Sequence, residues 1–176
     1  MAARCPALSP STFSSTVSER AVIMTGPVLF CYDGSDGSRG ALTDAGALLK
    51  HDVAIVVTVW ETLATRLATT GGLALAYIPD QGDLDAQEEA AARQAAELGV
   101  TIATQRGWEA SARVENARVC VWRTLIEVAD EIDAAVIVCG ARGRNAAKRV
   151  LLGSVAEAVL HHSHRPTLIA PEVPRG

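Results

Sequence analysis

The sequence predicts an α/β fold, in which an open parallel five-stranded sheet carries helices on both faces in a Rossmann-like arrangement. Stretches typical of strands alternate with stretches typical of helices five times, the order that produces parallel strands joined by right-handed crossovers. The strand-like stretches contain unbroken β-branched runs, as expected where both faces of a sheet are covered. Two of them end in polar turns that contain glycine, and ligands of such sheets bind at the carboxyl ends of the strands.

Length and composition indicate one compact domain. A chain of 176 residues with 49% apolar and 20% charged residues is large enough to bury a core and is not wholly disordered. The net charge of −4 argues against non-specific binding to nucleic acid, so any anion site must be local. No apolar run approaches the ~20 residues of a membrane span. We therefore expect neither nucleic-acid nor membrane partners.

The cysteines show no spacing typical of a metal site or a redox motif. None of the four belongs to a C-x-x-C pair, and two lie inside apolar strand-like stretches. We expect reduced, buried thiols in a cytoplasmic protein and no bound metal. The four are Cys5, Cys31, Cys120 and Cys139.

Residues 27–173 are expected to form the domain, and residues 1–26 a disordered extension. The extension is rich in Ser, Thr, Ala and Pro and has no hydrophobic period. A targeting segment, or a start codon placed ahead of Met24, stays an alternative for it. The elements expected in the first half of the domain are a strand over 28–32, a polar turn over 33–38, a helix over 39–50, a strand within 52–61, a loop over 62–83 and a helix over 84–106.

The third strand has two possible positions, 100–104 and 108–115. The first would leave some fifteen residues without structure before the next helix, whereas the second leaves about five, nearer the usual connection length. We therefore predict the second. The remaining elements are expected to be a helix over 121–132, a strand over 134–139, a helix over 155–162 and a strand over 167–170.

The turn after the first strand offers a carboxylate for binding. Asp33 lies at the carboxyl end of that strand, where it can accept a hydrogen bond from a ligand. The structural alternative is a simple turn, in which Ser35, Asp36 or Ser38 caps the following helix.

The loop after the fourth strand has the composition of a phosphate site. Gly140 and Gly143 can bring backbone N–H groups close to a ligand, and Gly153-Ser154 opens a helix whose first amides and dipole can hold phosphate oxygens. Alternatively, Ser154 caps that helix in a capping box with Glu157, and Gly140 is only a turn. The basic residues nearby are Arg142, Arg144, Lys148 and Arg149.

These spacings resemble a known family. The pattern Gly140-x2-Gly143-x9-Gly153-Ser154 is similar to the nucleotide-binding signature of universal stress proteins. The flanking residues Leu151, Leu152, Val155 and Ala156 fit as well, and Asp33-x-Ser35-x2-Ser38-x2-Ala41-Leu42 resembles the opening of the family. The resemblance covers about residues 28–171 and implies strand order 3-2-1-4-5, with a switch point between the first and fourth strands.

The resemblance also implies a ligand, a site and an assembly. ATP, alone or as its magnesium complex, would be bound with Asp33 and the backbone of Val59 at the adenine. Lys148 and Arg149 are weaker candidates for complementing the negative charge of the nucleotide. The alternative is that they lie on a solvated helix face. A homodimer would form through the edge strand over 167–170. The residues implied to hold ribose and phosphates are Gly140, Gly143, Gly153, Ser154 and Val155.

The favoured function is a stress-response binding or signalling module, with no catalytic residue assigned. An alternative is an enzyme for slow ATP hydrolysis or phosphoryl transfer, although the chain has neither a G-x-x-x-x-G-K-[ST] loop nor the kinase motifs. A second alternative is a dimeric partner-binding protein that uses no nucleotide. A dinucleotide enzyme is disfavoured because the first turn lacks G-x-G-x-x-G.

Overall fold

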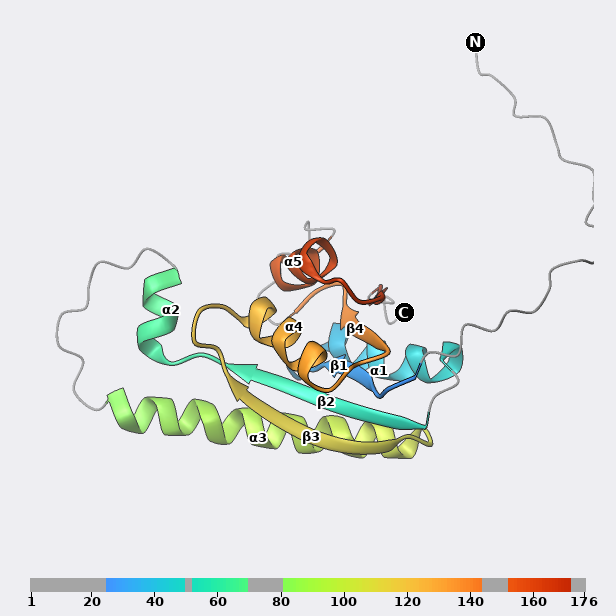
Figure 1. Cartoon of the computed structure of the whole chain (residues 1–176). Coiled ribbons are helices and arrows are strands. Elements are labelled where there is room, and N and C mark those ends of the chain that lie inside the picture. The colour runs from blue at the N-terminus through green and yellow to red at the C-terminus, as the bar shows by residue number, and fades with distance from the viewer. Residues whose placement is uncertain (1–24, 50–51, 70–80, 144–151, 172–176) are drawn as a thin grey trace, which may run out of the picture.

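The computed structural model describes residues 25–49, 52–69, 81–143 and 152–171. Their strands form one parallel sheet in the order β3-β2-β1-β4-β5, which confirms the α/β fold and the expected order (Figure 1). The sheet reverses its direction of winding between β1 and β4. The strands are β1 (Val28–Cys31), β2 (Val53–Trp60), β3 (Glu109–Asn116), β4 (Val136–Gly140) and β5 (Thr167–Ala170).

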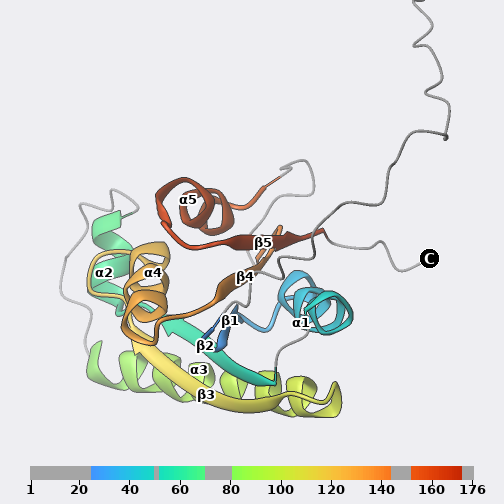
Figure 2. The same cartoon turned by 45° about the vertical axis from the view of Figure 1, so that its right-hand side comes forward.

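Helices cover both faces of the sheet (Figure 2). Val28 and Phe30 pack with α1 and α3, whereas Leu29, between them in the same strand, packs with α4 and α5. This alternation follows from the two-residue period of a strand, and it explains why both kinds of position are apolar. The helices are α1 (Asp36–Leu48), α2 (Leu63–Thr69), α3 (Gln81–Gln105), α4 (Val121–Glu131) and α5 (Ser154–His162).

The third strand lies where the connection-length argument placed it. β3 pairs along its whole length with β2, while residues 100–104 belong to α3. Trp108, just before β3, is buried and packs edge-to-face on Phe30 with ring centroids 5.3 Å apart. In the described part of the chain, no helix is both long enough and apolar enough to cross a membrane.

The expectation of a loop over residues 62–83 is wrong at both ends of that range. α2 begins at Leu63, and α3 begins at Gln81, earlier than the expected residue 84. The Thr62 hydroxyl accepts a hydrogen bond from the Thr65 amide at 3.1 Å, and the Asp85 carboxylate of α3 accepts one from the Leu63 amide at 2.9 Å. A seven-residue helix is marginal by propensity alone, so these contacts account for its presence.

The helix expected from residue 39 begins three residues earlier. Ser35, one of three candidate caps, occupies the N-cap position, and its hydroxyl accepts a hydrogen bond from the Ser38 amide at 3.1 Å. The expectation of a disordered segment over 1–26 falls mainly on residues outside the described ranges, and so do the proposed charges at Lys148 and Arg149.

Candidate functional site

The turn between β1 and α1 supplies the first part of the candidate site. Asp33 follows the end of β1 by two residues and is half-buried. Its Oδ1 accepts a hydrogen bond from the Ser35 amide at 3.0 Å. Gly34 between them has a φ of 79°, a left-handed conformation that favours glycine. The carboxylate therefore shapes its own turn in addition to any role toward a ligand.

The loop after β4 lies directly against that turn because two glycines allow it. A Cβ on Gly140 would lie 2.5 Å from the carbonyl carbon of Gly37 and 2.8 Å from the amide nitrogen of Ser38. A Cβ on Gly143 would lie 2.7 Å from Oδ2 of Asp33. All three distances are shorter than real Cβ contacts, but at Gly140 the atoms approached are backbone, whereas at Gly143 the atom is the tip of the Asp33 side chain. Gly140 therefore has a packing role that is independent of ligand binding, and Gly143 leaves room for the Asp33 carboxylate.

The start of α5 meets the same loop. The Gly153 amide donates a hydrogen bond to the Ala141 carbonyl at 2.7 Å, and a Cβ on Gly153 would lie 3.7 Å from the Gly143 nitrogen. Asp33 thus lies together with Gly143 and Gly153, which are far from it in the sequence, at the switch point between β1 and β4. The sequence motifs and the strand order therefore indicate the same place in the fold.

The predicted capping box at Ser154 is wrong. Gly153 is the N-cap of α5 and has no side chain, so Ser154 becomes the first residue of the helix, with an exposed side chain. A hydroxyl must stand at the N-cap position to reach the amide of the helix's third residue, and Ser154 stands one position too late. Among the described residues no side chain caps α5, so its first-turn amides, including those of Ser154 and Val155, keep their capacity to bind an anion.

The side chains of Val59 and Val155, two of the predicted site residues, pack against the apolar core. β2 brings Val59 to the same edge of the sheet, since Cys31 pairs with Val57 and Val59 lies two residues further on. The side chains of both valines pack against the apolar cluster beneath α4 and α5. A ligand at this edge would therefore meet their backbone groups, as the resemblance implied for Val59.

Two further residues support the site. Gly37 allows contact between the loops, because a Cβ there would lie 2.3 Å from the Arg142 carbonyl oxygen. Thr58 is buried, and its hydroxyl donates a hydrogen bond to the Tyr32 carbonyl at 2.9 Å, which holds β2 to the segment leading into Asp33. The sequence offered one signal for Gly37. Glycine lowers the stability of a helix, so a glycine in the first turn indicates that another segment packs close to it.

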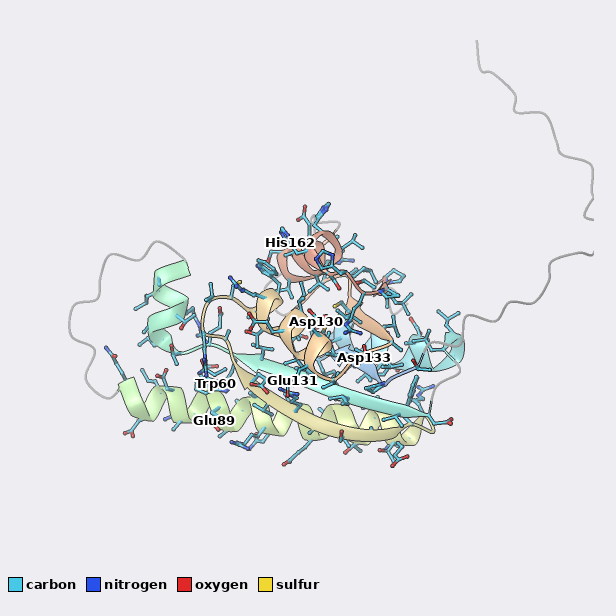
Figure 3. All side chains as sticks on the ribbon, in the orientation of Figure 1. Trp60, Glu89, Asp130, Glu131, Asp133 and His162 are labelled. Carbon is cyan, nitrogen blue, oxygen red and sulfur yellow. The ribbon has the colours of Figure 1, made fainter. Side chains whose placement is uncertain are left out.

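A hollow at the other end of the strands, where β4 and β5 begin, is lined by a structural ion-pair network. It has a volume of about 440 Å³ and lies beside Arg165. The Arg165 guanidinium donates to Asp130 at 2.8 Å, to Asp133 at 2.9 Å and to the Ala134 carbonyl at 2.7 Å; both acidic residues are labelled in Figure 3. In these bonds Arg165 pairs with Asp130 and Asp133, and the pairing joins α4 to the segment before β5. Within the described ranges, no group of three or more His, Cys, Asp or Glu side chains is placed to hold a metal ion.

Comparison with known proteins identifies the family. The model of the universal stress protein family matches residues 24–171. The chain belongs to the universal stress protein family. A putative universal stress protein of Staphylococcus saprophyticus is 42% identical over 43 residues. That match covers 24% of this chain and 26% of the relative, so the chain spans about a quarter of the length of that curated relative.

Solved structures show the same fold over most of the chain. The hypothetical protein MJ0577 matches with a TM-score of 0.69 at 19% identity, over 87% of this chain and 100% of that one. A universal stress protein from Burkholderia pseudomallei matches with a TM-score of 0.64 at 25% identity, over 85% and 98%.

Two structural relatives were solved with nucleotides. The universal stress protein from Archaeoglobus fulgidus in complex with dAMP has a TM-score of 0.55 at 21% identity, over 84% of this chain and 98% of that one. A universal stress protein in complex with cAMP has a TM-score of 0.53 at 23% identity, also over 84% and 98%. At these identities the likeness concerns the fold alone.

Proposed function

We propose that this universal stress protein binds ATP in the crevice between the β1–α1 turn and the segment from Gly140 to α5, and acts as a cytoplasmic stress-response module. The observation that carries the proposal is the meeting of Asp33, Gly143 and the uncapped start of α5 at one point of the sheet edge. An acceptor for the base thus lies beside donors for phosphates. The complexes of relatives with dAMP and cAMP support an adenine nucleotide as the ligand class.

Each part of the crevice suits a different part of the nucleotide. The Asp33 carboxylate can accept a hydrogen bond from an N–H group of adenine, with backbone groups of Val59 beside the same base. The amides at the start of α5, together with the positive end of its dipole, suit the phosphates. The backbone of Gly143 lies between these two ends and, together with that of Gly140, suits the ribose and the first phosphate. Magnesium would enter with the phosphates rather than through a protein site.

ATP is expected to stabilise the folded protein. Free ligand about a hundredfold above its dissociation constant adds roughly 2.7 kcal/mol to the free energy of unfolding, provided that only the native state binds it. For a domain of this size, each kcal/mol raises the melting temperature by about 2–4 °C. Thermal melts with millimolar ATP and magnesium measure the effect, with GTP and inorganic triphosphate as controls for base recognition and for general anion binding. An unchanged melting temperature in ATP contradicts the proposed function.

We also propose a homodimer through the β5 edge. β5 is the last strand in the sheet order, and Leu168 and Ile169 in it are half-buried in the single chain. Pairing of two such edges across a two-fold axis would cover an exposed ladder of backbone groups. Light scattering at micromolar concentration, with nucleotide present, is expected to give twice the chain mass. A monomer mass under these conditions contradicts the dimer without affecting the nucleotide proposal.

A further inference from the structure

Two cysteines lie side by side where β1 and β4 end. Phe30 of β1 pairs with Val138 of β4, so the next residues, Cys31 and Cys139, stand opposite each other on the same face of the sheet. The Cys139 thiol donates a hydrogen bond to the Cys31 sulfur, and the two Sγ atoms are 3.1 Å apart. Both are free thiols. They are 108 residues apart in the sequence, and the adjacency of β1 and β4 brings them together.

The strands already satisfy the backbone requirement for a disulfide between these residues. Neighbouring strands lie about 4.7–4.9 Å apart, within the range of about 4.4–6.8 Å between Cα atoms that disulfides span. Bond formation requires the two sulfur atoms to approach by about 1 Å, which side-chain rotation can supply without a change of strand pairing.

The two residues differ in exposure, although both thiols are buried. Cys139 is 3% exposed and belongs to the apolar cluster beneath α4 and α5, whereas Cys31 is half-buried at the carboxyl edge of the sheet. Cys31 is therefore the residue of the pair that lies nearer to solvent, and Cys139 is the second thiol. A second thiol 3.1 Å from the first favours a disulfide over further oxidation of the first sulfur.

We propose that Cys31 and Cys139 form a redox site that a hydroperoxide converts reversibly into an intramolecular disulfide. The Cys31 thiolate attacks one peroxide oxygen, the O–O bond breaks, and a sulfenic acid and hydroxide (or alkoxide) result. The Cys139 sulfur then attacks the Cys31 sulfur, the S–S bond forms, and the S–O bond breaks with loss of hydroxide. The two thiol protons neutralise the leaving groups. For hydrogen peroxide, the dithiol loses two electrons and the peroxide becomes two molecules of water.

The surroundings of Cys31 make this a slow site. The hydrogen bond with Cys139, burial and the negative charge of Asp33 together raise the pKa of Cys31 well above its ordinary value. Little thiolate is present at neutral pH, and the thiolate is the reactive form. The pair therefore stays reduced under mild conditions and oxidises under sustained exposure.

The test uses a full-length Cys5→Ser/Cys120→Ser protein, which retains only the pair. After treatment with hydrogen peroxide and its removal by catalase, the protein is denatured and alkylated, and its intact mass is measured. We expect most molecules to lose two hydrogen atoms and to take up no alkyl group. Dithiothreitol is expected to restore two alkylatable thiols, and a non-reducing digest should link the peptides that contain Cys31 and Cys139.

The matched controls carry Cys139→Ala or Cys31→Ala in the same background, and circular dichroism checks that they remain folded. Neither control is expected to lose two hydrogen atoms within one chain. Cys139→Ala should instead show oxygen added at Cys31. The proposal is overturned if the pair keeps both thiols under peroxide exposure that oxidises Cys120 in the unmodified chain. It is equally overturned if the only product is Cys31 sulfinate or a disulfide between chains.

Discussion

Replacement of Gly143 by glutamate is expected to weaken ATP binding about a hundredfold or more, since a like charge about 4 Å from a phosphate costs up to roughly 4 kcal/mol at an effective dielectric constant near 20. The substitution acts on both ends of the ligand. Its Cβ would lie 2.7 Å from Oδ2 of Asp33 and displace the carboxylate proposed to contact adenine. The added carboxylate would also stand near the start of α5, where the phosphates are expected. Calorimetric titration of ATP into the folded variant measures the loss.

Two companion variants separate the causes. Gly143→Ala introduces the Cβ without the charge, so its loss of affinity reports the displacement of Asp33 alone. Gln105→Glu adds the same charge at an exposed position near the end of α3, just before β3 begins at the opposite edge of the sheet. It is expected to bind ATP as the parent does. If folded Gly143→Glu also binds with parental affinity, the glycine loop is not the phosphate site and the proposed function loses its main support.

Replacement of Gly140 by alanine is expected to destabilise the fold by about 1–3 kcal/mol, the usual cost of forcing an extra carbon into a packed interior. The new methyl would meet the backbone of Gly37 at 2.5 Å and of Ser38 at 2.8 Å. Backbone atoms cannot rotate away as a side-chain tip can, so the start of α1 must shift relative to β4. Chemical denaturation without ligand measures the change as a lower midpoint at an unchanged slope.

The matched control is Gly40→Ala, a substitution inside α1, the helix against which Gly140 packs. A Cβ on Gly40 would meet no atom within 4 Å, and alanine is favoured over glycine in a helix interior by roughly 0.5–1 kcal/mol. This variant is therefore expected to be as stable as the parent or slightly more stable. If Gly140→Ala and Gly40→Ala are equally stable, the close contact between β4 and α1 does not require glycine at position 140.

The same comparison distinguishes the structural and binding roles of the glycine signature. Spacing alone left open whether Gly140 shapes a turn or cradles a ligand. The structure gives Gly140 a packing partner in α1, and it places Gly143 against the side chain of Asp33. A loss of stability is therefore the expected signature of substitution at Gly140. A loss of affinity is the expected signature at Gly143.

Periodicity and turn chemistry in the sequence determined the kind of each major element and its approximate position. β-Branched runs such as 136–138 predict strands buried on both faces, and the connection length before α4 selected the correct third strand. These features are local, so the chain carries them without its partners. The order of the strands came from the family resemblance, because a buried strand reads alike at any interior position of a sheet.

Contacts between distant segments were decided only by the tertiary structure. α2 depends on Asp85 of α3, and the start of α5 is set by the bond from Gly153 to Ala141, which leaves Ser154 inside the helix despite its capping pattern. The thiols of Cys31 and Cys139 meet although no short motif joins them. In each case the deciding neighbour is brought near by strand order or helix packing, and neither is encoded in the spacing of adjacent residues.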